Sequence, residues 1–318
     1  MNKQELDNAL AFIDAPQGEL QIILYANIEG IAEPRKLDIK EEDLSGLRQL
    51  FASSIKASII EKEDYTVLPL STADERGNCF YQYDLDIPDE LQLLETTIGN
   101  DNLQNFSFID NQFSNIESLI IVLADTENEI SLFKKLSTVE VIGRGGFMLW
   151  KSNQRLEKFN DQLLRISSKF QALRVGGEII ITDLASIEKG FGFHDIIIRE
   201  ATNSIRVIEE LRLVSNIDSL ENLVSDVRFA RKLTKVARNS PVIQRNIPNA
   251  DIIAFSKRHP LTKNKMRYNA NQTQFLLDTR VSKDLLIKIL NDDLLTSELT
   301  KLYYDSLAKD GIEVEEEQ

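Results

Sequence analysis

Cysteine and histidine are almost absent from this sequence of 318 residues. It contains one cysteine, Cys79, and two histidines, His194 and His259. A single thiol cannot form an internal disulfide, and such scarcity is typical of proteins in a reducing cytoplasm. A structural zinc site usually takes four cysteine or histidine ligands. The composition therefore excludes a disulfide-stabilised fold and argues strongly against zinc.

Long apolar runs are missing as well. The longest, Leu119 to Ala124, has the length of a strand, whereas a helix that spans a bilayer needs about 20 residues. The first ten residues, MNKQELDNAL, contain no uninterrupted apolar stretch and no small-residue cleavage site. We therefore expect no secretory signal and no membrane helix. An apolar content of 42% is ordinary for a globular protein, so we expect a folded cytoplasmic chain.

Basic side chains are scarce overall and concentrated in one stretch. The chain has 37 lysines and arginines against 51 acids, a formal net charge of -14. Residues 226 to 267 nevertheless hold eleven cations and two acids, so this segment alone carries +9. Such a positive segment in an acidic protein indicates contact with a polyanion.

The first part of this segment, residues 226 to 239, has helical spacing. Ser225 or Asp226 can start the helix, and Pro241 follows its end. At about 100° per residue, the apolar side chains fall on one half of the helix. The other half carries only cations, namely Arg228, Arg231, Lys232, Lys235 and Arg238. Like charges on one face are destabilising, so the pattern predicts an anionic partner. That partner is either nucleic acid or acids of the N-terminal region, which would cover the face within the fold or across a dimer.

A second group of cations follows in Ser256 to Tyr268, a stretch typical of a polar loop or ribbon. Its basic residues are Lys257, Arg258, Lys263, Lys265 and Arg267. Cations interspersed with amides suit contacts to phosphate and sugar, which position a duplex without reading its sequence. Solvated loop lysines are the alternative. Together with the helix, this loop predicts one surface that binds double-stranded DNA through its backbone.

The periodicity of apolar residues predicts an α+β fold with mixed or antiparallel sheets and flanking helices. Residues 1 to 115 carry eight cations and 22 acids and are expected to form a smaller acidic α/β domain. Residues 116 to 311 are expected to form the larger C-terminal domain, followed by an acidic tail at 312 to 318. We expect the molecule to be a homodimer.

Local patterns in the larger domain predict particular elements. Two β-favouring runs, 170 to 175 and 178 to 182, flank Gly176-Gly177, which predicts a hairpin. Apolar spacing predicts two closing helices, at 282 to 290 and 296 to 309.

The glycine clusters do not predict a phosphate-binding loop. Gly143, Gly145 and Gly146 are followed by no Lys-Ser or Lys-Thr pair and lead into a strand-like stretch. A hairpin turn is the expected structure.

No pattern predicts catalysis. Acids are so common here that a triple such as Asp183, Glu188 and Lys189 carries little information about a nuclease. Neither histidine has patterned partners for a nucleophilic triad; we expect His194 to pack and His259 to contact phosphate. The expectation is a protein with no catalytic residue, no metal site and no cofactor. A metal-dependent nuclease with dispersed carboxylates is the alternative.

The C-terminal part of the chain resembles a known family. The resemblance rests on IIAFSKRHPLTKNKMRYN and QFLLDTRVSKDLLIKILNDDLLTSELTKLYYDSLAKD within 251 to 310, with FQALRVGGEIIITDLASIEKGFGF and RFARKLTKVAR upstream. These runs are similar to the KwaB-like family of the bacterial Kiwa anti-phage defence system, over about residues 116 to 310. The resemblance assigns no individual binding residue.

What the resemblance implies is a cytoplasmic DNA-binding effector. Its partner would be a KwaA-like membrane protein that recruits it to the inner membrane face. It would bind phage DNA and block replication or late expression. A scaffold that docks its basic face on an acidic partner or on anionic lipid is a further alternative.

Overall fold

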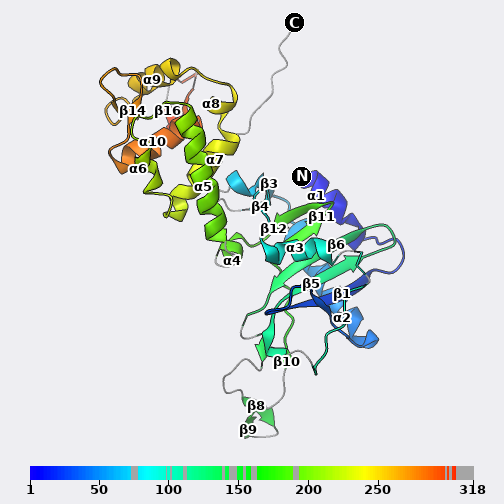
Figure 1. Ribbon diagram of the computed structural model, residues 1–318. Coiled ribbons are helices and arrows are strands. Elements are labelled where there is room, and N and C mark those ends of the chain that lie inside the picture. The colour runs from blue at the N-terminus through cyan, green and yellow to red at the C-terminus, as the bar shows by residue number, and fades with distance from the viewer. Residues whose placement is uncertain are drawn as a thin grey trace. The chain divides into compact units, whose positions relative to one another are not determined.

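The computed structural model describes twelve stretches of the chain: residues 1–72, 78–97, 99–100, 102–109, 113–137, 140–142, 149–152, 155–158, 163–188, 193–297, 299–300 and 303–305. The chain forms two compact units (Figure 1). The first comprises Met1–Leu70 and Gly77–Phe193, and the second comprises Ser71–Arg76 and His194–Gln318.

The first unit is built on an eight-stranded sheet with the order β2-β1-β5-β6-β11-β12-β4-β3. Every pair in it is antiparallel except β3–β4, which is parallel. Its strands are β1 (Gln21–Ile28), β2 (Arg35–Lys36), β3 (Thr66–Pro69), β4 (Cys79–Gln82), β5 (Ile116–Ala124), β6 (Glu129–Lys135), β11 (Ala172–Val175) and β12 (Glu178–Ile181). Two small ladders join β7 (Val141–Ile142) to β10 (Leu163–Leu164) and β8 (Leu149–Ser152) to β9 (Arg155–Lys158). Its helices are α1 (Lys3–Leu10), α2 (Glu41–Ile55), α3 (Asp89–Thr96) and α4 (Leu184–Glu188).

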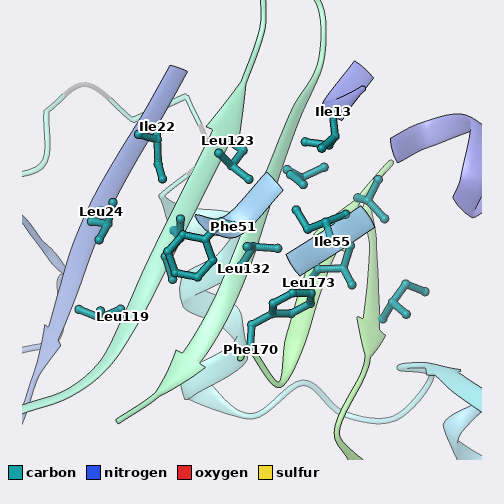
Figure 2. Packing of buried hydrophobic residues seen from close by; sticks show 14 of the residues in the cluster. Ile13, Ile22, Leu24, Phe51, Ile55, Leu119, Leu123, Leu132, Phe170 and Leu173 are labelled. Atoms are coloured by element: carbon teal, nitrogen blue, oxygen red, sulfur yellow. The ribbon is translucent and has the colours of Figure 1, made fainter. Parts of the chain in front are cut away.

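Strand β5 lies inside the sheet because its residues are apolar on both faces. Six consecutive residues, Ser118 to Leu123, are buried, as expected for a strand covered on both sides. On one face, Phe51 and Ile55 of α2 pack with Leu132 and Leu173 in the main core cluster (Figure 2). On the other face, the Ser131 hydroxyl donates to the Leu94 carbonyl of α3 at 3.0 Å. The sheet is therefore a middle layer between helices.

The hairpin predicted around Gly176-Gly177 is present. Strands β11 and β12 pair in register from Ala172 opposite Ile181 to Val175 opposite Glu178. Both glycines have positive φ, +58° and +85°. A two-residue turn of this kind needs left-handed backbone at both positions, which glycine adopts at little steric cost.

A buried ion pair lies at the end of β6. Lys134 is 1% exposed, and its Nζ donates to Glu140 Oε1 at 2.8 Å, Ser167 Oγ at 2.7 Å and the Lys169 carbonyl at 3.0 Å. Burial alone raises the pKa of the Glu140 carboxyl. Hydrogen bonds from Lys134, Ser137 and Ser167 outweigh that effect and lower this pKa to about 2. The network ties Ser137 and Glu140 to Ser167 and Lys169.

The described part of the second unit is mainly helical, with three short strand pairings. Its helices are α5 (Phe193–Glu210), α6 (Asp218–Glu221), α7 (Val227–Asn239), α8 (Pro241–Gln244), α9 (Asn249–Arg258) and α10 (Arg280–Leu290). Its strands are β13 (Arg267–Tyr268), which pairs with β14 (Phe275–Leu276), and β15 (Leu294–Thr296), which pairs with β16 (Tyr303–Asp305). Val214 adds a parallel bridge to Phe275.

The predicted α+β class is confirmed, and one predicted helix is wrong. Residues 296 to 309 were expected to be helical, yet Tyr303–Asp305 is a strand paired with Leu294–Thr296. The apolar residues in this stretch fit helical spacing, but Leu299 is 93% exposed. A short apolar pattern does not separate a helix from a pair of short strands.

The boundary between the two compact units differs from the domain boundary that the sequence suggested. The boundary expected after residue 115 falls immediately before β5, which pairs along its whole length with β1. The polar stretch near residue 100 is therefore a connection within one sheet. The first compact unit instead continues through Phe193, and the second continues from His194.

Candidate nucleic-acid interface

Helix α7 has the amphipathic form predicted for it. Phe229, Leu233 and Val236 are fully buried on its inner face, and α10 contacts α7 within the second unit (Figure 1). Lys232 and Arg238 are exposed, whereas Arg231 and Lys235 are half-buried. The side chain of Arg228 lies outside the described part of the chain.

Acids from neighbouring helices meet two of the exposed cations on α7. Lys232 Nζ lies 2.9 Å from Asp284 Oδ1 on α10, and Arg238 lies 3.0 Å from Glu200 on α5. Lys232 keeps half of its side chain exposed. Acids thus cover part of this face, as in the alternative to nucleic acid, but they come from α5 and α10 and not from the N-terminal region. The cationic face of α7 is therefore partly neutralised by the unit's own carboxylates.

A further arginine belongs to the same network. Arg280 on α10 bonds Asp226 at 3.0 Å and Asp284 at 3.3 Å, and its guanidinium lies 4.7 Å from the centre of the Phe229 ring. Arg280 lies on α10, outside the basic segment 226 to 267, so the charge pattern of that segment did not reveal it.

The second group of cations lies on an ordered turn. Helix α9 extends through Arg258, so Lys257 and Arg258 lie in its last turn and not in the expected loop. Cations are favourable there because the carbonyl end of a helix carries partial negative charge. The predicted loop boundary was wrong by about three residues, an ordinary error for helix ends.

Buried side chains fix the turn that presents Lys263 and Lys265. The Thr262 hydroxyl donates to the Ser256 carbonyl at 2.6 Å, and the Met266 amide donates to the Thr262 carbonyl at 3.0 Å. Thr262 and Met266 are buried, whereas Lys263 and Lys265 are exposed. Two cations therefore point to solvent from a backbone that is held in place.

Lys257 and Arg267 have nearby partners but stay exposed. Lys257 Nζ donates to Gln272 Oε1 at 2.7 Å and lies 5.0 Å from the centre of the Tyr268 ring. Arg267 pairs with Asp278 at 2.7 Å and keeps 71% of its side chain exposed. An exposed pair of this kind contributes at most about 1 kcal/mol, so a phosphate can compete for Arg267.

The two groups of cations are held by separate sets of partners. Those of α7 meet acids on α5 and α10, whereas Lys257 and Arg267 meet the β13–β14 hairpin and the residues after it. All cations of the second group are exposed, and we call them the α9–β13 surface: Lys257, Arg258, Lys263, Lys265 and Arg267. That all ten cations form one interface stays a prediction.

Both expectations for the histidines were wrong. His259 is 3% exposed, stacks on Phe255 with ring centres 5.2 Å apart, and meets the Tyr303 ring edge-on at 4.9 Å. Burial lowers the pKa of its imidazole below the ordinary 6.5. His259 therefore packs at the base of the α9–β13 surface and does not face a phosphate, whereas His194 is exposed.

Sequence reasoning missed Arg212, an exposed cation beside the same surface. It lies before the basic segment and has a positive φ of 52°. Its backbone is brought there because the Leu213 carbonyl accepts from the Phe275 amide at 2.8 Å, and the Arg212 carbonyl accepts from Gln274 Nε2 at 2.9 Å. No local pattern signals such a long-range pairing.

No group of three or more histidine, cysteine, aspartate or glutamate side chains in the described ranges lies close enough to hold a metal ion. None of the helices in those ranges has the length and apolarity to cross a membrane.

Comparison with known proteins identifies the family. A model of the family described as Kiwa protein KwaB-like matches residues 113–300, more than half of the chain. The chain belongs to the KwaB-like family. It is also 27% identical over 280 residues to the Kiwa protein KwaB of Escherichia coli O55:H7 (strain RM12579 / EPEC). The matched residues make up 86% of this chain and 89% of that protein. No solved structure matches it. The KwaB-like stretch contains all ten predicted cations and parts of both compact units.

Neutralising an acid beside α7 is expected to strengthen the binding of DNA. Asp284→Asn removes the partner of Lys232 and one partner of Arg280. We expect duplex DNA to bind about 2- to 5-fold more tightly, with a salt dependence steeper by up to about one phosphate contact. Fluorescence anisotropy at several salt concentrations measures both quantities. Asp292→Asn, which removes one exposed acid beyond α10, is the matched control for net charge. Equal effects of the two variants would count against a role for the α7 face.

Proposed function

We propose that this KwaB-like protein is the DNA-binding subunit of a Kiwa anti-phage defence system. It holds duplex DNA mainly by contacts to phosphates and blocks phage DNA replication or late expression, without cleaving the strand. A KwaA-like membrane protein is its partner and brings it to the inner membrane face. The protein acts as a homodimer.

The observation that supports DNA binding best is the α9–β13 surface. Its cations are exposed, while the turn that carries Lys263 and Lys265 is fixed by buried Thr262 and Met266. Because the backbone of this turn is already ordered, only the lysine side chains lose conformational entropy when they bind phosphates. The turn is positive in a protein whose net charge is -14. Such a local concentration of positive charge favours contact with an anionic partner.

The acidity of the rest of the chain shapes how DNA binds. A protein of net charge -14 repels DNA at long range, so attraction is confined to the cationic patch. Binding is then local and strongly salt-dependent, because each phosphate contact releases counterions.

A salt titration with and without divalent metal tests the proposal. We expect a labelled duplex to bind with a log–log salt slope of about -3.6 to -4.5, which corresponds to about four to five phosphate contacts at roughly -0.9 each. Adding Mg²⁺ or Mn²⁺ should leave plasmid DNA intact. Nicked plasmid would favour the nuclease. Co-purification with a membrane partner that survives nuclease treatment, without any DNA shift at low salt, would favour the scaffold.

A further inference from the structure

A groove lies beside the α9–β13 surface, within the second unit. It runs along α9 and opposite the loop that joins β13 to β14, and its volume is about 520 Å³. All of its lining residues are cations, amides, hydroxyls or small and apolar side chains. The acids nearest in the chain, Glu210 and Asp251, are not among them. The groove therefore favours an anionic ligand.

Two cations flank the groove. Arg212 comes from the segment that pairs with β14, and Lys257 comes from the last turn of α9. Lys257 is positioned in advance by the Gln272 side chain at 2.7 Å and the face of Tyr268 at 5.0 Å. Tyr268 is in turn fixed by a 2.9 Å hydrogen bond to the buried Ser256 hydroxyl. A cation held in this way binds a phosphate with little further ordering.

The floor of the groove is apolar. Ile253 and Ala254 of α9 supply it, and Ala250 extends it toward the start of the helix. Amide and hydroxyl groups of Gln272 and Thr273 face it from the opposite loop. The groove thus combines apolar side chains with two positive charges.

We propose that this groove binds one unpaired nucleotide of a DNA strand, at a strand end or in a single-stranded segment. The phosphate lies between Arg212 and Lys257, and the base lies on Ile253 and Ala254. The inference rests on the proposed function and deepens it. An intact duplex offers its phosphates but keeps its bases stacked inside, so it leaves the apolar floor uncovered; an unpaired nucleotide fills both parts.

The test compares two labelled probes, a blunt duplex of two separate strands without a hairpin loop and the same duplex with a four-nucleotide single-stranded overhang. The wild-type protein should bind the overhang probe about tenfold more tightly, because the overhang adds a phosphate contact and buries part of one base against apolar side chains. Arg212→Gln and Ala254→Leu should each abolish the preference while leaving the affinity for the blunt duplex within about twofold. Arg245→Gln, which removes an exposed cation outside the groove, is the control and should keep the preference.

The outcomes separate the two proposals. Equal binding of both probes by the wild-type protein, or a preference that survives both groove variants, would overturn the groove assignment and leave duplex binding intact. If neither probe binds, the proposed function fails, and a four-nucleotide single strand then tests the groove alone. Binding of that strand that is lost in Arg212→Gln but kept in Arg245→Gln supports the groove, whereas the absence of binding overturns it as well.

Discussion

Reversing Lys263 and Lys265 to glutamate is expected to weaken duplex binding by about 100-fold at moderate salt. Both side chains are exposed on the fixed turn of the α9–β13 surface. The double change removes two phosphate contacts and adds two repulsive charges. Because each contact contributes about 0.9 to the salt slope, the slope should fall by about two. Fluorescence anisotropy across a salt series measures the affinity and the slope together.

Surface reversals at these positions should leave the free energy of unfolding within about 0.5 kcal/mol. The matched control is Lys36→Glu with Lys169→Glu, two exposed lysines of the first unit, which changes the net charge equally. If the control weakens DNA binding as strongly as Lys263→Glu with Lys265→Glu, total charge and not this surface governs affinity. Reversing Arg231, Lys232 and Lys235 is a poorer test, since Arg231 and Lys235 are half-buried and Lys232 pairs with Asp284.

Replacing Lys134 with methionine is expected to lower the free energy of unfolding by about 3–5 kcal/mol. The change removes the cation that faces Glu140, whose side chain is 13% exposed, and leaves a largely buried carboxylate without that partner. Urea denaturation followed by circular dichroism measures the loss. Adding Glu140→Gln to the same chain removes the uncompensated charge and should recover more than half of it. A double variant no more stable than Lys134→Met would show that packing, and not the ion pair, sets the cost.

The same pair predicts how stability depends on pH. The pKa of Glu140 is about 2 in the folded protein and 4.5 ordinarily. The folded state therefore binds fewer protons, so the ion pair stabilises it fully above pH 4.5. This contribution is lost as the pH falls from 4.5 toward 2. The double variant, which lacks the carboxyl, should lose less stability over this interval than the wild-type protein.

Local patterns predicted the elements whose structure is decided locally. The apolar run in β5 needs cover on both faces whatever surrounds it, and Gly176-Gly177 supplies the backbone that a two-residue turn requires. The apolar half of α7 likewise fixed which of its faces is buried.

Contacts between segments that are distant in the sequence could not be predicted from local patterns. The cations on α7 do lie next to anions, but two of these, Asp284 and Glu200, come from other helices of the same unit. Nothing near those acids in the sequence marks them as partners. Arg212 reaches the groove only through the pairing of its segment with β14, and Tyr303–Asp305 is a strand only because Leu294–Thr296 lies beside it.

The order of strands in the large sheet bears on how this protein can be divided. The KwaB-like stretch begins at residue 113 and supplies the four adjacent strands β5, β6, β11 and β12. Both flanks of that set are completed by residues that precede it, since β1 covers β5 and β4 covers β12. Produced alone, residues 113 to 300 would present two bare, strongly apolar strand edges, a known route to aggregation. We therefore expect a fragment of residues 113 to 300 to aggregate, and a fragment that stays in solution to need β1 and β4 from the acidic N-terminal segment.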